Sequence, residues 1–170
     1  MKMTNIILVL TATAVALIAG LFYAYSCSVN IGLGKLNDTE YLKAMQSINR
    51  AILNPLFFSS FIGALLLLPV CTYLHYDGII NRRFLLLFSA TFIYTLGTFG
   101  VTLFGNVPLN DALDKFNIST ATIAEILLQR TNFEKAWNNF NTVRTIASVL
   151  SLVLVILACI ISKTRALEVE

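Results

Sequence analysis

Four long stretches of this sequence contain no charged residue, and they constrain the fold more than any other feature. They lie between Lys2 and Lys35, between Arg50 and Asp77, between Arg83 and Asp111, and between Arg144 and Lys163. A helix needs about 20 apolar residues to cross the hydrocarbon layer of a bilayer, so each stretch is long enough for one crossing. Only 12% of the residues are charged, against about 25% in a typical soluble domain. We therefore predict an all-α integral membrane protein, a single domain over residues 1–170 whose four-helix bundle has spans near 5–25, 55–74, 84–104 and 145–161.

The positive charges predict the orientation of the chain. Lys2, the pair Arg82 and Arg83, and Lys163 with Arg165 fall on one side of a four-span topology. Positive residues beside spans favour the cytoplasmic side, so both termini are predicted to be cytoplasmic. The two outer connections also hold positive residues: Lys35, Lys43, Arg50, Lys115, Arg130 and Lys135. We expect a multi-pass protein of a cell membrane, most simply a bacterial inner membrane, with the lipid bilayer as its partner and no nucleic-acid-binding face.

The first outer connection is predicted to contain an amphipathic helix of its own. Asn37 and Glu40 have the spacing of a helix cap, and apolar residues follow at helical spacing. Asn54 and Pro55 are expected to end this helix and to begin the second span, since proline suits the first turn of a helix.

The second outer connection begins with Gly105-Asn106-Val107-Pro108-Leu109-Asn110, which predicts a turn that ends the third span. Two pairs with capping-box spacing follow: Thr122 with Glu125, and Thr131 with Glu134. Such a pair satisfies the free amides at the start of a helix. We expect the second pair to open a helix that runs from about Asn132 to Ile161 and projects beyond the membrane.

Polar residues on this last helix form a candidate binding site. Trp137, Asn141 and Arg144 are spaced to share one face, which Ser148 and Ser151 continue. An arginine with a neighbouring asparagine can bind a carboxylate, a phenolate or a carbonyl group. The alternative is that Arg144 reaches to the membrane surface while Trp137 belongs to an interfacial aromatic belt, and the periodicity alone favours this alternative.

Asparagines from three regions of the chain fall at the same predicted outer end: Asn49, Asn54, Asn106, Asn110 and Asn141. If they converge, they form a polar cup, because an unpaired amide near hydrocarbon is costly. Asparagines also cap helices and form turns, which would explain Asn54 and Asn110 without a site.

The threonines at positions 91, 95, 98 and 102 share a face of the third span, where close helix packing is the simplest explanation.

No metal site or cofactor motif is apparent. His75 is the sole histidine, and the three cysteines include no CxxC pair. A zinc or haem site would need further ligands nearby, so we predict neither a metal nor a cofactor. Nucleotide-binding and serine-hydrolase fingerprints are also missing.

Several segments resemble the anthrone-oxygenase-like family of small membrane proteins. They are Met45-Gln46-Ser47-Ile48-Asn49, Asn54-Pro55-Leu56-Phe57, the stretch from Gly105 to Asn110, and Trp137 with its spacing to Asn141 and Arg144. The resemblance covers residues 20–160. The family includes fungal members associated with oxidising anthrones to anthraquinones. The resemblance implies a site at Asn49, Asn54, Asn106, Asn110, Trp137, Asn141 and Arg144.

The chain departs from the family at one position of interest. Many relatives have Trp-Asn-His before the arginine region, whereas Phe140 and Thr142 flank Asn141 here. A mechanism that uses this histidine as a base or ligand therefore does not carry over, and no catalytic residue is assigned.

Two classes of function remain open. The first is an oxygenase that acts on a lipophilic phenolic or ketonic molecule in the outer cup, where Arg144 and the asparagines stabilise an enolate and Trp137 stacks on the rings. The second is a non-enzymatic module that binds a lipid or a partner membrane protein. The absence of a convincing general base favours the second class.

Overall fold

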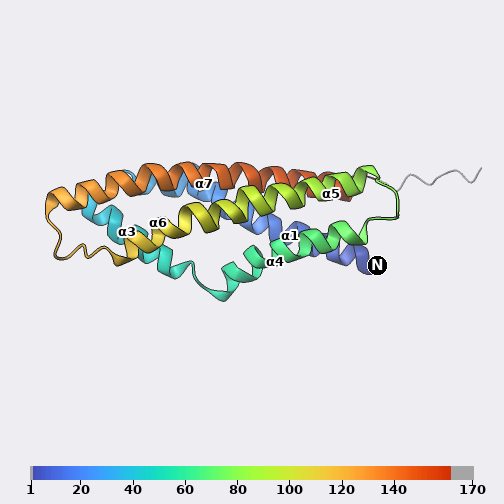
Figure 1. The fold of residues 1–170 in the computed structure, drawn as a ribbon, viewed down its shortest axis with the longest axis horizontal. Helices are drawn as coiled ribbons and strands as arrows, with labels where there is room; N and C mark the ends of the chain where they lie inside the picture. Colours follow the sequence, from blue (N-terminus) through green and yellow to red (C-terminus); the bar gives the residue numbers. More distant parts are fainter. Residues whose placement is uncertain (1, 162–170) are drawn as a thin grey trace, which may run out of the picture.

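The computed structural model describes residues 2–161 as a rod of long helices (Figure 1). The first helix comprises α1 (Met3–Ala24), the π-helical segment η1 (Tyr25–Val29) and α2 (Asn30–Leu33). Two helices follow it, α3 (Asp38–Ala51) and α4 (Pro55–Leu74). The next comprises α5 (Arg82–Ile93), the π-helical segments η2 (Tyr94–Gly100) and η3 (Thr102–Asn106), and α6 (Val107–Lys115); α7 (Ile123–Ile160) is last.

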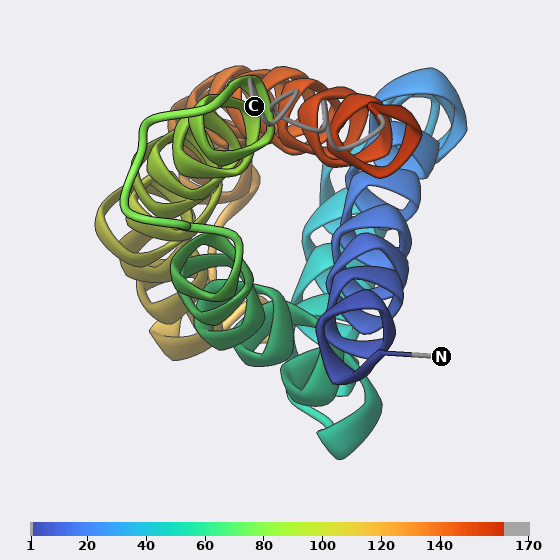
Figure 2. The same ribbon diagram turned by 90° about the vertical axis from the view of Figure 1, so that its right-hand side faces the viewer.

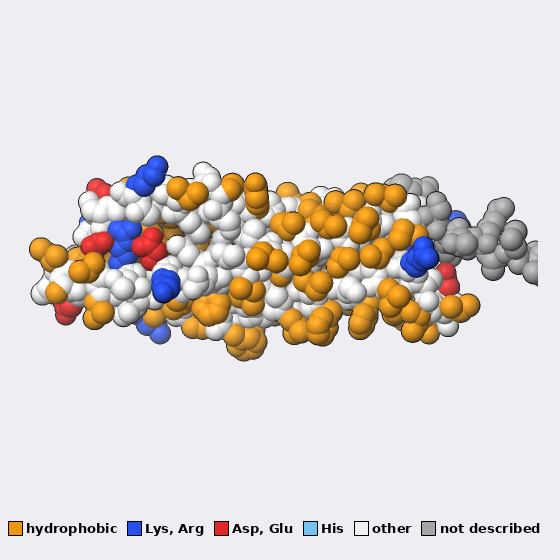
Figure 3. Space-filling model, turned by 90° about the horizontal axis from the view of Figure 1, so that it is seen from above, with side chains coloured by type: hydrophobic (Ala, Val, Ile, Leu, Met, Phe, Trp, Pro, Cys, Tyr) orange, Lys and Arg blue, Asp and Glu red, His pale blue; other side chains and the backbone are white. Residues whose placement is uncertain are grey.

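Four of these helices are long and apolar enough to cross a membrane, and they begin at Met3, Pro55, Arg82 and Ile123. This confirms the predicted all-α membrane bundle. Viewed along the rod, α1 packs against α4 and α7, and α5 also packs against both (Figure 2). Apolar side chains cover the middle of the visible surface, whereas Lys, Arg, Asp and Glu gather at the ends (Figure 3). The predicted orientation remains a prediction, since it also depends on Lys163 and Arg165, which lie outside the described residues.

The predicted helix starts at Asn37 and Asn54 are confirmed. The side-chain oxygen of Asn37 accepts a hydrogen bond from the Glu40 amide at 2.9 Å, and that of Asn54 accepts one from the Phe57 amide at 3.0 Å. Each bond satisfies an amide that has no partner inside its own helix. Local sequence alone therefore sets where α3 and α4 begin.

The predicted turn at residues 105–110 is wrong, because the helix that begins at Arg82 continues to Lys115. Pro108 lies in the first turn of α6, directly after η3, where its missing amide hydrogen costs little. Gly105 is needed for packing instead of turning: a Cβ atom there would lie 2.9 Å from the ring of Phe140. The turn-forming residues thus serve a close contact between η3 and α7.

The predicted start of the last helix near Asn132 is also wrong. The first capping box, Thr122 with Glu125, opens α7 at Ile123. Thr131 instead donates its hydroxyl to the Leu127 carbonyl within the helix, at 2.8 Å. With 38 residues, α7 is about 57 Å long, so nearly half of it extends beyond a hydrocarbon layer of about 30 Å.

The end of the rod that holds α3 and α6 is closed by polar contacts. Arg130 of α7 donates to the carbonyl oxygens of Gly34 and Leu36 at 3.1 and 2.8 Å, and it pairs with Asp38 and Glu134 at 3.0 and 2.8 Å. Arg50 of α3 pairs with Asp114 of α6 at 2.5 Å. These contacts hold α3 and α6 in place over the bundle.

Replacing Arg130 with methionine is expected to lower the free energy of unfolding by about 2 kcal/mol, since two carboxylates and two carbonyls lose a largely buried partner. Arg50→Met is the matched control. Its ion pair is 63% and 51% exposed, so its loss should cost less than about 0.5 kcal/mol. Thermal unfolding of both variants in the same detergent checks this, and equal melting temperatures would contradict it.

Candidate functional site

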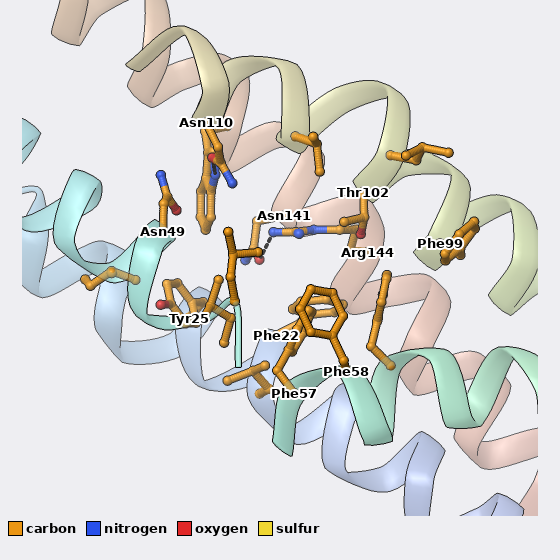
Figure 4. A pocket seen from close by; sticks show the side chains of 18 of the residues that line it. Phe22, Tyr25, Asn49, Phe57, Phe58, Phe99, Thr102, Asn110, Asn141 and Arg144 are labelled. Carbon is orange, nitrogen blue, oxygen red and sulfur yellow. Dashed lines mark hydrogen bonds between the residues drawn. The ribbon is translucent and has the colours of Figure 1, made fainter. Parts of the chain in front are cut away.

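A cavity of about 320 Å³ lies inside the end of the bundle beneath α3 and α6 (Figure 4). It separates two clusters of buried side chains. Phe22 and Phe61 belong to the core between the four long helices, while Trp137 belongs to the core under α3 and α6, and all three line the cavity. The volume falls at the lower end of the range for small-molecule sites.

Aromatic rings form most of the cavity wall. They come from α1, η1, α4, η2 and α7: Phe22, Tyr25, Phe57, Phe58, Phe61, Phe99 and Trp137. Phe57 stacks on Phe61 with 5.0 Å between ring centroids, and Tyr25 lies 5.6 Å from Trp137. Such a wall suits a flat aromatic ligand, because aromatic pairs gain energy beyond the area they bury.

Arg144 is the one charged side chain among the described residues that line the cavity. It is only 5% exposed, and no carboxylate of residues 2–161 lies within 4 Å of it. The guanidinium carbon is 4.3 Å from the ring centre of Phe22 and 5.3 Å from that of Trp137, and Nε has no hydrogen-bond partner in the described chain. A buried cation without a counter-charge is costly, so the cavity favours a ligand that brings negative charge.

Asn141 accepts a hydrogen bond from this guanidinium. Its Oδ1 atom accepts a hydrogen bond from Nη2 of Arg144 at 3.0 Å, as the dashed line in Figure 4 shows. Asn141 is fully buried, and it lies one turn before Arg144 on the buried face of α7. The amide therefore fixes the position of Arg144 without neutralising its charge.

Trp137 is held at both its ring and its backbone. The indole nitrogen donates to Oδ1 of Asn110 at 2.9 Å, and the carbonyl accepts from Nδ2 of Asn106 at 3.3 Å. Asn106 and Asn110 belong to the helix that packs against α7 at this level. They fix the indole plane, which forms part of the cavity wall.

The structure brings five of the seven predicted site residues to the cavity: Asn49, Asn110, Trp137, Asn141 and Arg144. Asn106 is buried behind the wall and acts through the Trp137 backbone. Asn54 lies away from the cavity, where it caps α4 and donates to the Ala51 carbonyl at 2.8 Å. Arg144 and Trp137 are each 5% exposed, so neither reaches out to the membrane surface.

The threonine face of the third span is divided between packing and the cavity. Thr91 shares a hydrogen bond of 2.9 Å with Thr72 of α4, and Thr98 is fully buried. Thr102 lines the cavity. Packing between helices thus accounts for the inner part of this face.

Sequence reasoning missed the aromatic wall and Ser26. Phe57, Phe61 and Phe99 occur within apolar spans, where residues that line a cavity and residues that fill a core have the same pattern. The hydroxyl of Ser26 accepts a hydrogen bond from Asn141 and shares another with the hydroxyl of Thr145, both on α7. A serine in an apolar run is common in tightly packed membrane helices, so it carried no signal.

The cavity opens at the side of the rod through an apolar rim. Three lining residues are also strongly exposed, Leu53 at 66%, Phe58 at 42% and Leu103 at 45%. They belong to the connection between α3 and α4, to α4 itself and to η3. Exposed apolar side chains at the mouth of a cavity suit the entry of a lipophilic molecule.

No group of three or more His, Cys, Asp or Glu side chains suited to a metal ion occurs within residues 2–161. The Nδ1 atom of His75, the residue that follows α4, donates to the Cys71 carbonyl at 2.8 Å. The cavity itself is lined by amides, aromatic rings and Arg144, which are not typical ligands of a redox metal.

Comparison with known proteins identifies the family of this chain. No curated protein and no solved structure matches the chain. A family model described as anthrone oxygenase matches residues 56–154, which is more than half of the chain and includes Asn106, Asn110, Trp137, Asn141 and Arg144. With its four membrane helices and these residues inside the match, the chain belongs to the anthrone oxygenase family.

Proposed function

We propose that this protein oxidises a lipophilic phenolic or ketonic molecule of the anthrone type with dioxygen, inside the cavity around Arg144. The observation that carries the proposal is a buried guanidinium with no carboxylate partner among residues 2–161, set in an aromatic cavity with an exposed apolar rim. In the predicted orientation, this cavity faces the outer side of the membrane.

The chemistry asks for stabilisation of one negative charge. Loss of a proton from the methylene carbon of an anthrone gives an enolate, whose charge lies largely on the carbonyl oxygen. Arg144, held by Asn141, supplies a positive charge for that oxygen in a site with little water. No Asp, Glu, His or Lys occurs among the described residues that line the cavity, so the substrate's proton passes to a water molecule.

The remaining steps need only dioxygen. The enolate carbon gives up electrons to dioxygen and bonds to it, and protonation of the resulting peroxide gives a hydroperoxide. Loss of water from this hydroperoxide forms the second carbonyl. One anthrone and one dioxygen thus become one anthraquinone and one water. The aromatic wall holds the flat ring system in place while Arg144 stabilises the negative charge of the enolate.

Purified protein in lipid nanodiscs tests this proposal. Anthrone is added, dioxygen uptake is followed with an electrode, and anthraquinone is followed by absorbance. We expect both to rise above the rates in empty nanodiscs, with one dioxygen consumed for each anthraquinone formed. Empty nanodiscs measure the spontaneous oxidation of anthrone. Rates with the protein that equal this spontaneous rate would contradict the proposal.

The missing base favours a second candidate, a module that binds a lipid without turning it over. The apolar rim and aromatic wall also suit part of a lipid molecule. Native mass spectrometry of wild-type protein and Arg144→Ala separates the candidates. A lipid that copurifies with the wild type alone, together with no turnover, supports the binding module. A bound quinone or an oxidised product supports the oxygenase.

A further inference from the structure

We propose that Ser26 is a positioning residue that orients Asn141 and, through it, Arg144. The inference deepens the proposed function, because it concerns the same cavity. Ser26 lies in η1, outside the residues matched by the family model, and it is partly buried between the first helix and α7. Its hydroxyl contacts both Asn141 and Thr145, which lie one turn apart on α7.

The contacts form a chain of hydrogen bonds that leads away from Arg144. Nη2 of Arg144 donates to Oδ1 of Asn141 at 3.0 Å, and Nδ2 of Asn141 donates to Oγ of Ser26 at 3.0 Å. Ser26 and Thr145 hydroxyls are 2.9 Å apart. Thr145 donates to the carbonyl oxygens of Phe22 and Asn141 at 3.0 and 2.8 Å.

The donor and acceptor roles along this chain of hydrogen bonds follow from Thr145, where the chain ends. The single hydroxyl hydrogen of Thr145 is used on carbonyl oxygens, which only accept. The Ser26 hydroxyl must therefore donate to Thr145, which leaves its oxygen free to accept from Asn141. Asn141 then presents its oxygen, and not its NH₂ group, to Arg144. Each bond polarises the next, so the chain acts as a unit.

Without the Ser26 oxygen, the NH₂ group of Asn141 loses its acceptor, and only the bond to Arg144 still orients the amide. The side chain of Asn141 can then leave the rotamer that brings its oxygen to the guanidinium. Arg144 would lose a fixed acceptor and, with it, its position beside the rings of Phe22 and Trp137. The charge would remain in the protein but would no longer be held where an anionic oxygen binds.

The experiment uses two aromatic probes of similar shape and the fluorescence of Trp137, the sole tryptophan of the chain. 2-Naphthoate carries a negative charge, and 2-acetylnaphthalene is neutral. In nanodiscs, Ser26→Ala is expected to bind naphthoate about tenfold more weakly, the effect of one hydrogen bond to a charged group, with little change for the neutral ketone. Ser26→Thr keeps the hydroxyl and should restore binding. Ser28→Ala, an exposed serine of η1, is the matched control.

Equal weakening of both probes in Ser26→Ala would assign Ser26 a packing role and overturn the inference, as would unchanged naphthoate binding. The emission maximum of Trp137 without ligand gives a second readout, since the guanidinium lies 5.3 Å from the indole centre. It should shift in Ser26→Ala in the same direction as in Arg144→Ala, and an unshifted maximum would also overturn the inference. Wild-type protein that binds both probes equally would count against the proposed function, while the ligand-free shift would still decide the role of Ser26.

Discussion

Replacing Arg144 with methionine is expected to lower kcat for anthrone oxidation by about 10²- to 10³-fold, the usual effect of removing a preorganised group that stabilises an oxyanion. Methionine keeps much of the apolar stem that packs between Phe22 and Trp137. Because Arg144 has no carboxylate partner among residues 2–161, the substitution leaves no buried negative charge behind. Steady-state dioxygen uptake in nanodiscs measures the effect.

Arg144→Lys is the informative companion to this variant. Lysine keeps the positive charge but lacks the planar donors that fit Asn141 and an enolate together, so its kcat should lie between those of wild type and Arg144→Met. Both variants should retain binding of 2-acetylnaphthalene, which the aromatic wall contacts. A methionine variant with wild-type kcat would show that Arg144 does not stabilise the reacting anion.

Asn141→Asp is expected to lower kcat by about 10²-fold, although the two side chains have nearly the same shape. The amide oxygen lies 3.0 Å from Nη2 of Arg144, so a carboxylate at this position would form an ion pair with the guanidinium. That pair supplies the counter-charge that the substrate anion would otherwise bring. Aspartate also loses the NH₂ donor that Ser26 accepts. Affinity for 2-naphthoate should fall together with kcat.

The control for this variant is Asn139→Asp, two residues earlier on α7. Asn139 is exposed and does not line the cavity. The Asn139→Asp substitution therefore adds the same charge to the same helix without placing a carboxylate beside Arg144. Its kcat should match that of the wild type. If Asn141→Asp and Asn139→Asp lose activity equally, the effect comes from net charge and not from neutralisation of Arg144.

The sequence predicted most of the fold because its signals are local. An uncharged run of sufficient length reveals a membrane helix by itself, and the caps at Asn37 and Asn54 satisfy amides within the next turn. The shared face of Trp137, Asn141 and Arg144 follows from the helical repeat alone. These predictions need no knowledge of how one helix packs on another.

Prediction was wrong where packing overrides local preference. Gly105 and Pro108 read as a turn, yet η3 keeps the helix continuous and uses the glycine for contact with Phe140. Thr131 has the residue type of a helix cap, but its hydroxyl is satisfied inside α7, which the capping box of Thr122 and Glu125 already opens at Ile123. In both places, the local signal was real and a tertiary contact or an earlier cap decided the outcome.

By itself, the sequence determined the four membrane helices, the helix starts at Asn37 and Asn54 and the polar face of α7, since each depends on residues within a few turns of one another. Only the tertiary structure decided that Arg144 faces a cavity, that Asn54 lies outside it, and that Ser26 reaches Asn141 across 115 positions of sequence. The physical reason is that an isolated helix presents every side chain on its surface. Which of them becomes buried, and beside which partner, depends on how the other helices pack against it.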